Sequence, residues 1–140
     1  MPLSSPARDL QASINGVLKK VPHALAVVLG TADGLLVTTS AGLDRGVADE
    51  LAAVACGVVF IVAGSRVRMF GDDEVDIAVV RLRRRVLVVK PVGDEFVLAT
   101  VAEPEVDVAE ACSTTAELAR RVAKLITPEL REELQQALPM

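Results

Sequence analysis

The sequence contains very few aromatic residues. Of its 140 residues, Phe, Trp and Tyr together make up 2%, and neither Trp nor Tyr occurs. Hydrophobic residues as a whole reach 51%, so the chain can bury a core of ordinary domain size, and that core must be aliphatic. The shortage also removes the platform on which bases stack in single-stranded nucleic-acid binders. A formal net charge of −4 further disfavours nucleic acid as a partner.

The familiar motifs of catalysis and nucleotide binding are missing too. The sequence has no GxxxxGK[ST] phosphate loop, and no GxSxG, HExxH or CxxC. His23 is the single histidine, which excludes a two-histidine metal site, and we interpret it as an ordinary residue at a helix–strand junction. The acidic runs 72–74 and 103–107 are candidate cation ligands, but such runs are more often solvated loops. We therefore expect no enzyme activity, no cofactor and no bound metal.

Cysteine is scarce, and no targeting signal is visible. Cys56 and Cys112 lie in segments of helical character without a partner spacing, so we expect reduced thiols in a cytoplasmic protein, with Cys56 a small buried residue rather than a reactive one. Residues 1–10 contain no apolar signal region. The longest apolar run, 51–64, falls short of a roughly 30 Å hydrocarbon core at about 1.5 Å per residue. We expect no stable membrane insertion.

The hydrophobic pattern predicts a single α+β domain over residues 1–140. The predicted helices are 6–20, 46–69, one that starts near 106–109, and a short last helix at 128–138. The predicted strands are 24–30, 35–40, 74–82, 85–92 and 95–103. Asp33-Gly34 marks a tight turn between the first two strands, and short connectors make the last three an antiparallel meander. This order predicts a five-stranded antiparallel sheet with helices on its faces.

Side chains that can accept backbone N–H groups mark the helix ends. Ser5-Pro6 is a candidate start for the first helix, and Asp44 precedes the long one, which we expect Gly71 to close. Two capping-box patterns compete for the next helix, Asp107 with Glu110 and Thr114 with Glu117. We favour the first of these.

The long helix 46–69 is apolar on nearly every side, so more than one of its faces needs cover. We assign a bulky face to the sheet, made of Leu51, Val54, Ala55, Val58, Ile61 and Val62. The opposite side is mostly small and uncharged, and it comprises Asp49, Ala53, Cys56, Gly57, Phe60 and Gly64. Either a terminal helix or a partner covers this side. We favour a partner, because one face of the sheet already needs both terminal helices.

Strand 74–82 gives a second sign of a partner. Val75, Ile77 and Val79 share one face, the other face is also fairly apolar, and a meander places this strand at the sheet edge. An exposed apolar edge invites pairing, and a second copy across a two-fold axis removes that hazard.

Four arginines surround the turn that follows this strand: Arg81, Arg83, Arg84 and Arg85. The simplest interpretation is a solvated turn that resists aggregation. The alternatives are contact with an acidic protein partner and, less favoured, contact with lipid or nucleic acid. An arginine can also assist GTP hydrolysis in trans, although we do not favour that role here.

Several segments together resemble the roadblock/dynein light chain family. They are "ADGLLVTTSAGLD", the long helix rich in alanine and valine, "DEVDIAVVRL" and "RVLVVKPVGDEFVLATVA", and the similarity spans about residues 8–127. It is nearest to bacterial members of the MglB type. The resemblance implies sheet order 2-1-5-4-3, with the central helix on one face and the terminal helices on the other, in a roadblock (profilin-like) topology.

The resemblance also implies a function. Family members form dimers in which the third strands join and the central helices pack side by side, and MglB-type dimers regulate a small Ras-like GTPase. By this resemblance the chain is a non-catalytic homodimer that binds such a GTPase as activator or scaffold. The implied partner-binding residues are Asp49, Ala53, Cys56, Gly57, Phe60 and Gly64, and the implied dimer edge is Val75, Ile77 and Val79.

A second hypothesis is a small-molecule sensor or a signalling scaffold without a GTPase partner. A sensor needs a pocket in which polar groups converge. The predicted strands offer few such groups, namely Thr38, Thr39, Lys90 and Thr100.

Overall fold

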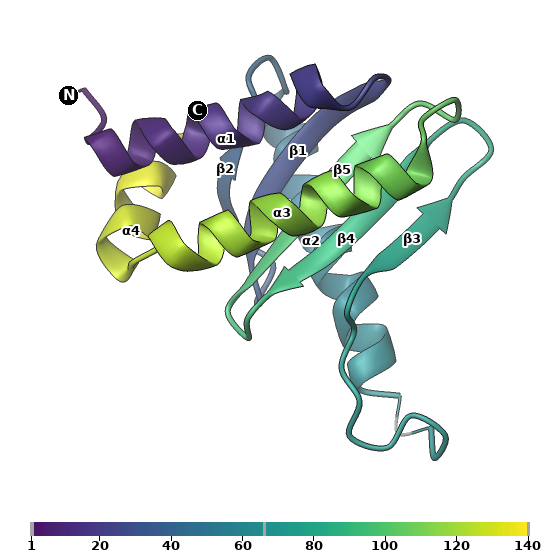
Figure 1. Ribbon diagram of the computed structural model, residues 1–140. Coiled ribbons are helices and arrows are strands. Elements are labelled where there is room, and N and C mark those ends of the chain that lie inside the picture. Colours follow the sequence, from purple (N-terminus) through teal and green to yellow (C-terminus); the bar gives the residue numbers. More distant parts are fainter. Residues whose placement is uncertain (1, 66, 140) are drawn as a thin grey trace.

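The computed structural model describes residues 2–65 and 67–139, which form three layers (Figure 1). The helices are α1 (Ser5–Lys20), α2 (Arg45–Ala63), α3 (Val108–Leu125) and α4 (Pro128–Gln136). The strands are β1 (Ala24–Thr31), β2 (Leu36–Thr39), β3 (Ala78–Arg81), β4 (Val86–Val92) and β5 (Phe96–Ala102). Figure 1 shows α1 and α3 across one face of the sheet and α2 behind it, with α4 beside β2.

The strands form one antiparallel sheet in the order β2-β1-β5-β4-β3, which confirms the predicted fold class and topology. The β1–β2 turn contains Asp33-Gly34, as predicted. Gly34 adopts φ +89°, and the Asp33 carboxylate accepts from the Thr31 hydroxyl. β2 and β3 are the edges of the sheet.

Each helix starts at a side chain that caps its free backbone donors. The Asp44 carboxylate accepts from the Val47 N–H (3.2 Å), and the Asp107 carboxylate accepts from the Glu110 N–H (3.1 Å), which confirms the favoured start of α3. For α1 the cap is Ser4, one residue before the predicted serine. The alternative start at Thr114 is wrong, because this residue lies buried in the middle of α3.

The sheet separates two aliphatic cores. The larger one lies under α1, α3 and α4, and its largest fully buried side chains include Leu10, Ile14, Leu29, Leu98 and Leu134. The smaller one lies under α2, where Ala48, Ala52 and Ala55 pack against valines and alanines of the strands. Phe96 is the one aromatic side chain in either core among the described residues. The predicted aliphatic core is therefore confirmed.

Two predicted elements are shorter than expected. α2 ends at Ala63 rather than at 69, with Gly64 as its C-cap, and Arg66 lies outside the described residues. The last turn of α2 projects past the sheet, so no sheet packing supports a longer helix there (Figure 1). Gly71 does take a left-handed φ of +56°, but it closes a turn onto the Arg68 carbonyl instead of a helix.

β3 begins at Ala78, so Val75 and Ile77 precede the strand instead of lying in it. The ladder with β4 pairs Ala78 with Val89 and goes no further in that direction. Pro91 follows shortly after in β4 and has no N–H to extend the ladder. The Lys90 ammonium instead donates to the Asp76 carbonyl and carboxylate oxygens, both at 2.8 Å.

Only part of the predicted bulky face of α2 packs on the sheet. Ala55 is buried, and Leu51 and Val58 are half-buried against the smaller core, whereas Val54 is 50% exposed and Ile61 75% exposed. The closest approach is made by small residues, because a Cβ added to Gly30 of β1 would lie 3.1 Å from the Ala52 Cβ. The helix comes this close only where both surfaces are small, so Ala48, Ala52 and Ala55 occupy the centre of the contact and Val54 and Ile61 lie outside it.

We expect Gly30→Val to destabilise the fold by about 1–3 kcal/mol, because the added side chain forces α2 away from the sheet. Urea unfolding measures the change. Gly16→Ala is the matched control, since a Cβ at Gly16 meets nothing within 4 Å. It should leave stability unchanged or raise it by up to about 1 kcal/mol through helix propensity. Equal stability of Gly30→Val and the natural chain would contradict the close packing.

Candidate functional site

The side of α2 that faces away from the sheet is apolar and exposed. Val47, Val54 and Ile61 recur every seven residues and form an exposed stripe along it, and Phe60 (55% exposed) flanks the other side. Ala53, Gly57 and Gly64 lie between these larger side chains. We call this set of seven residues the outer α2 face.

By length and composition alone, α2 is apolar enough to cross a membrane. Its mean hydropathy is 2.0 and only 17% of its most apolar stretch is buried. The helix nevertheless packs on β1, β2, β4 and β5 through its alanine face, so it forms one layer of the domain. Packing on the sheet explains the alanine face of the helix, but it does not explain why the outer α2 face is apolar. Exposed apolar patches on a folded domain often mark interaction sites.

The six predicted partner-binding residues do not share one surface. Asp49, Ala53, Phe60 and Gly64 are exposed, and Gly57 is half-buried with open space around its missing Cβ. Cys56 is different: its thiol points to the β1–β2 turn and donates to the Ala32 carbonyl oxygen at 2.8 Å. Cys56 is half-buried against the β1–β2 turn, less buried than we expected, and its thiol points away from the outer α2 face.

Sequence reasoning missed the segment that follows α2. Val67, Met69 and Phe70 lie in turns after the helix and are exposed, Met69 to 93%. The segment forms an arm that projects with the end of α2 below the sheet (Figure 1). Its apolar residues had been counted as part of a helix, so the signal was present but was assigned to the wrong element. The arm thus adds exposed apolar side chains to those of the outer α2 face.

The sheet edge at β3 lies close to this surface. β3 pairs only with β4 among the described residues, so its other side presents unpaired backbone groups. Val79 is exposed, whereas Val75 and Ile77 are half-buried, and Ile77 packs against the larger core. Of the three predicted edge residues, only Val79 lies within the strand.

The predicted arginine turn lies at the far end of β3. Arg81, Arg83, Arg84 and Arg85 are all exposed, and the Leu82 N–H donates to the Arg85 carbonyl to close the turn. Across the described residues, none of these four guanidinium groups lies within 4.0 Å of a carboxylate. The turn therefore presents positive charge that its own chain does not neutralise.

A small pocket lies between α2 and the β4–β5 turn. Its volume is about 190 Å³, and its lining includes Cys56, Phe60, Val75, Pro91 and Phe96. Typical ligand pockets occupy about 300–1,000 Å³ and hold convergent polar groups. The polar groups expected of a sensor are dispersed instead: Thr39 is near the Val27 carbonyl, Lys90 binds Asp76, and Thr100 shares a hydrogen bond with Thr115.

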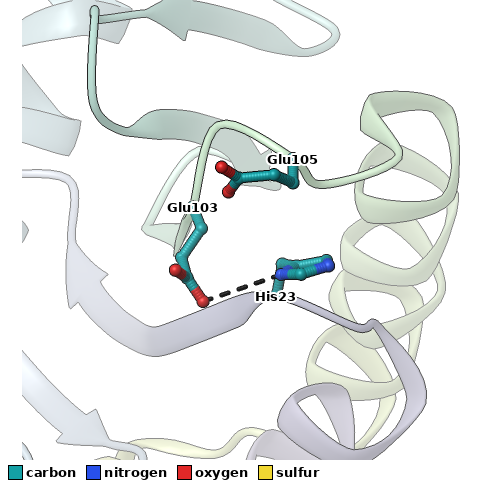
Figure 2. Close-up of side chains that lie close together, drawn as sticks. All are labelled: His23, Glu103 and Glu105. Atoms are coloured by element: carbon teal, nitrogen blue, oxygen red, sulfur yellow. Dashed lines mark ion pairs between the residues drawn. The ribbon is translucent and has the colours of Figure 1, made fainter.

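His23 forms the one group of possible metal ligands found among the described residues, together with Glu103 and Glu105 (Figure 2). The Glu103 N–H donates to the His23 carbonyl, which holds the two residues together, and His23 Nδ1 lies 3.7 Å from a Glu103 carboxylate oxygen. The three donor atoms lie within 4.8 Å of one another. They can offer a cation one nitrogen and two oxygen ligands, but the His23 and Glu103 side chains are nearly half exposed, and no further ligand from the chain completes a site.

Both cysteines are chemically quiet. Burial, with a smaller contribution from the Asp33 carboxylate, raises the pKa of the Cys56 thiol, and burial raises the pKa of the Cys112 thiol. A raised pKa lowers the thiolate fraction at neutral pH, and the thiolate is the nucleophile.

We expect Cys56 to react with iodoacetamide more slowly at pH 7.5 than a free cysteine does, and to speed up as the pH rises toward its raised pKa. Cys112→Ser isolates the Cys56 signal, and the same chain in urea supplies the reference rate. Mass spectrometry of the labelled chain measures the rates. A folded-state rate at pH 7.5 above the urea rate would show an activated thiol instead.

Comparison with known proteins places the chain in a family. The sequence profile of the Roadblock/LC7 domain matches residues 14–102. A Roadblock/LC7 domain structure from Streptomyces avermitilis is 31% identical, with TM-score 0.76, and the match covers 81% of this chain and 94% of that one. No curated protein sequence matches the chain.

Two MglB structures share the fold at lower identity. Myxococcus xanthus MglB is 17% identical with TM-score 0.72, and the match covers 83% of this chain and 93% of that one. An MglB described as having a tetrameric arrangement is 15% identical with TM-score 0.76, covering 96% of both chains. The chain therefore belongs to the Roadblock/LC7 domain family, and it has the fold of the MglB structures.

Proposed function

We propose that the protein is a non-catalytic homodimer that acts in the cytoplasm and regulates a small Ras-like GTPase, by stimulating its hydrolysis or by holding it in place. The observation that carries this proposal is the set of exposed apolar side chains on the outer α2 face and the arm. A chain with no catalytic motif that presents such a surface is suited to bind proteins. Its membership of the Roadblock/LC7 family supports the same class of function.

Self-association uses two features of this surface. Gly57 and Gly64 leave a shallow track along the second half of α2, so a second helix can approach closely, while Val54 and Ile61 beside the track gain burial. Completing the burial of a half-exposed valine, isoleucine or phenylalanine contributes about 1 kcal/mol. Pairing of β3 with its own copy satisfies the open backbone groups of the edge. The tetrameric arrangement of one MglB supports self-assembly in this fold.

The GTPase is proposed because the chain resembles MglB-type members, which accompany Ras-like GTPases. The proposed contact is the part of the α2 surface that the second copy leaves free, around Asp49 and Ala53 at the start of the helix. Both residues are exposed, and neither belongs to the arm or to β3.

A pull-down with the natural chain, run with GDP and with a non-hydrolysable GTP analogue, tests the GTPase assignment. A small GTPase retained mainly with the analogue, and lost when Ala53→Arg replaces the natural chain, supports a regulator of the GTP-bound state. Single-turnover hydrolysis with that purified GTPase then separates stimulation from scaffolding. Recovery of other proteins without a GTPase in either state would make the protein a scaffold of another kind.

We expect Gly57→Arg and Phe60→Asp each to convert the dimer to a monomer at micromolar concentration, because a charge or a long side chain is placed where two helices must approach closely. Light scattering after size-exclusion chromatography measures the mass. Leu25→Asp is the matched control, since Leu25 is 43% exposed on β1, away from α2. Dimers from all three variants would contradict the assigned interface, and circular dichroism checks that each variant is folded.

A further inference from the structure

The edge strand β3 separates two exposed segments of opposite charge. Before it lies an acidic segment, which we define as Asp72, Asp73, Glu74 and Asp76, and after it lies the arginine turn, Arg81 and Arg83–Arg85. In Figure 1 the acidic segment is on the side of the arm and the arginine turn is at the opposite end of the strand. One charged segment thus lies at each end of the open edge of β3.

Neither segment is neutralised within its own chain. In the described residues, the one ion pair that either segment makes is Asp76 with Lys90, at 2.8 Å, which also holds the Asp76 pKa below its usual range. Asp72, Asp73 and Glu74 have no cation within 4.0 Å among these residues. The chain as a whole has net charge −4, yet a basic turn and an acidic segment are separated at opposite ends of one open edge.

We propose that these two segments form a reciprocal electrostatic clamp between two copies of the chain. The proposal rests on the homodimer of the proposed function, and it adds the interaction that sets the relative orientation of the two copies. When β3 pairs antiparallel with its own copy, the arginine turn of each copy lies beside the acidic segment of the other, and the two-fold axis repeats the contact at both ends.

The register of the strand supports this match. A two-fold axis through the midpoint of β3 (Ala78–Arg81) places Val79 of one copy opposite Val80 of the other. Beyond Arg81 the chain turns back toward β4, so the arginine turn lies at the end of the strand instead of continuing its line. In the antiparallel pair this end of one copy lies beside the residues that precede Ala78 in the other copy, and Asp76 is the first acidic residue among them.

The clamp acts on orientation and partner choice more than on affinity. Exposed ion pairs are individually weak and are screened by salt over about 8 Å at physiological ionic strength. Like charges placed opposite each other are unfavourable, and parallel pairing of β3 with its copy sets arginine against arginine and carboxylate against carboxylate. The charge pattern therefore favours the antiparallel arrangement. The valines of the edge do not by themselves distinguish antiparallel from parallel pairing.

Charge exchange between two variants tests the clamp. One variant carries Arg83→Glu, Arg84→Glu and Arg85→Glu, and the other carries Asp72→Lys, Asp73→Lys and Glu74→Lys. Each variant has two like-charged segments at the pairing edge, whereas a mixture of the two pairs opposite charges at both ends. Sedimentation equilibrium at low and high salt gives the dissociation constants. Arg120→Glu with Arg121→Glu is the control, since both residues are exposed on α3.

We expect each variant alone to self-associate at least about tenfold more weakly than the natural chain at low salt. The equimolar mixture should form a heterodimer of near-natural affinity, as should a single chain that carries all six changes. High salt should reduce these differences, and the control should match the natural chain.

Natural-strength homodimers from both variants, with no preference for the mixture, would overturn the clamp while the proposed homodimer stands. A natural chain that is monomeric at all concentrations would instead overturn the homodimer itself. If the arginine variant dimerises normally but loses a captured GTPase, the turn contacts an acidic surface of that partner, and the clamp is wrong.

Discussion

The close packing of α2 on the sheet is the contact on which the rest of the surface depends. Because Gly30 has no side chain, Ala52 can approach β1 closely, and the helix then rests on its smallest residues. A helix has only one face to bury in this way, so Val47, Val54 and Ile61 are left exposed. The same contact that completes the smaller core therefore leaves an apolar stripe on the surface.

The two apolar features of the surface follow from how each element ends. α2 runs past the sheet before Gly64 ends it, so the last turn of the helix and the arm project beyond the strands (Figure 1). β3 begins only at Ala78, because Pro91 of β4 has no N–H to extend the ladder and the Lys90 ammonium binds the oxygens of Asp76. A charged segment without strand pairing therefore precedes a short strand. The open edge and the projecting helix end are joined by the segment between α2 and β3.

Much of the fold was predictable because its signals are local. The turn at Asp33-Gly34, the caps at Asp44 and Asp107 and the apolar runs of β4 and β5 each depend on neighbours within a few residues. The candidate site was predictable only as a region. The orientation of α2 depends on a glycine more than twenty residues away in the chain, and helical periodicity cannot detect such a partner, so Val54 and Ile61 were assigned to the wrong side.

The sequence by itself determined the class of fold, the order of the elements and the aliphatic core, since these depend on composition, spacing and caps. Tertiary structure alone decided which face of α2 is buried, that Cys56 points to the β1–β2 turn and where α2 and β3 end. The physical reason is that packing selects between faces by the space available across the contact. That space is set by residues from distant parts of the chain, which come together only when the sheet has formed.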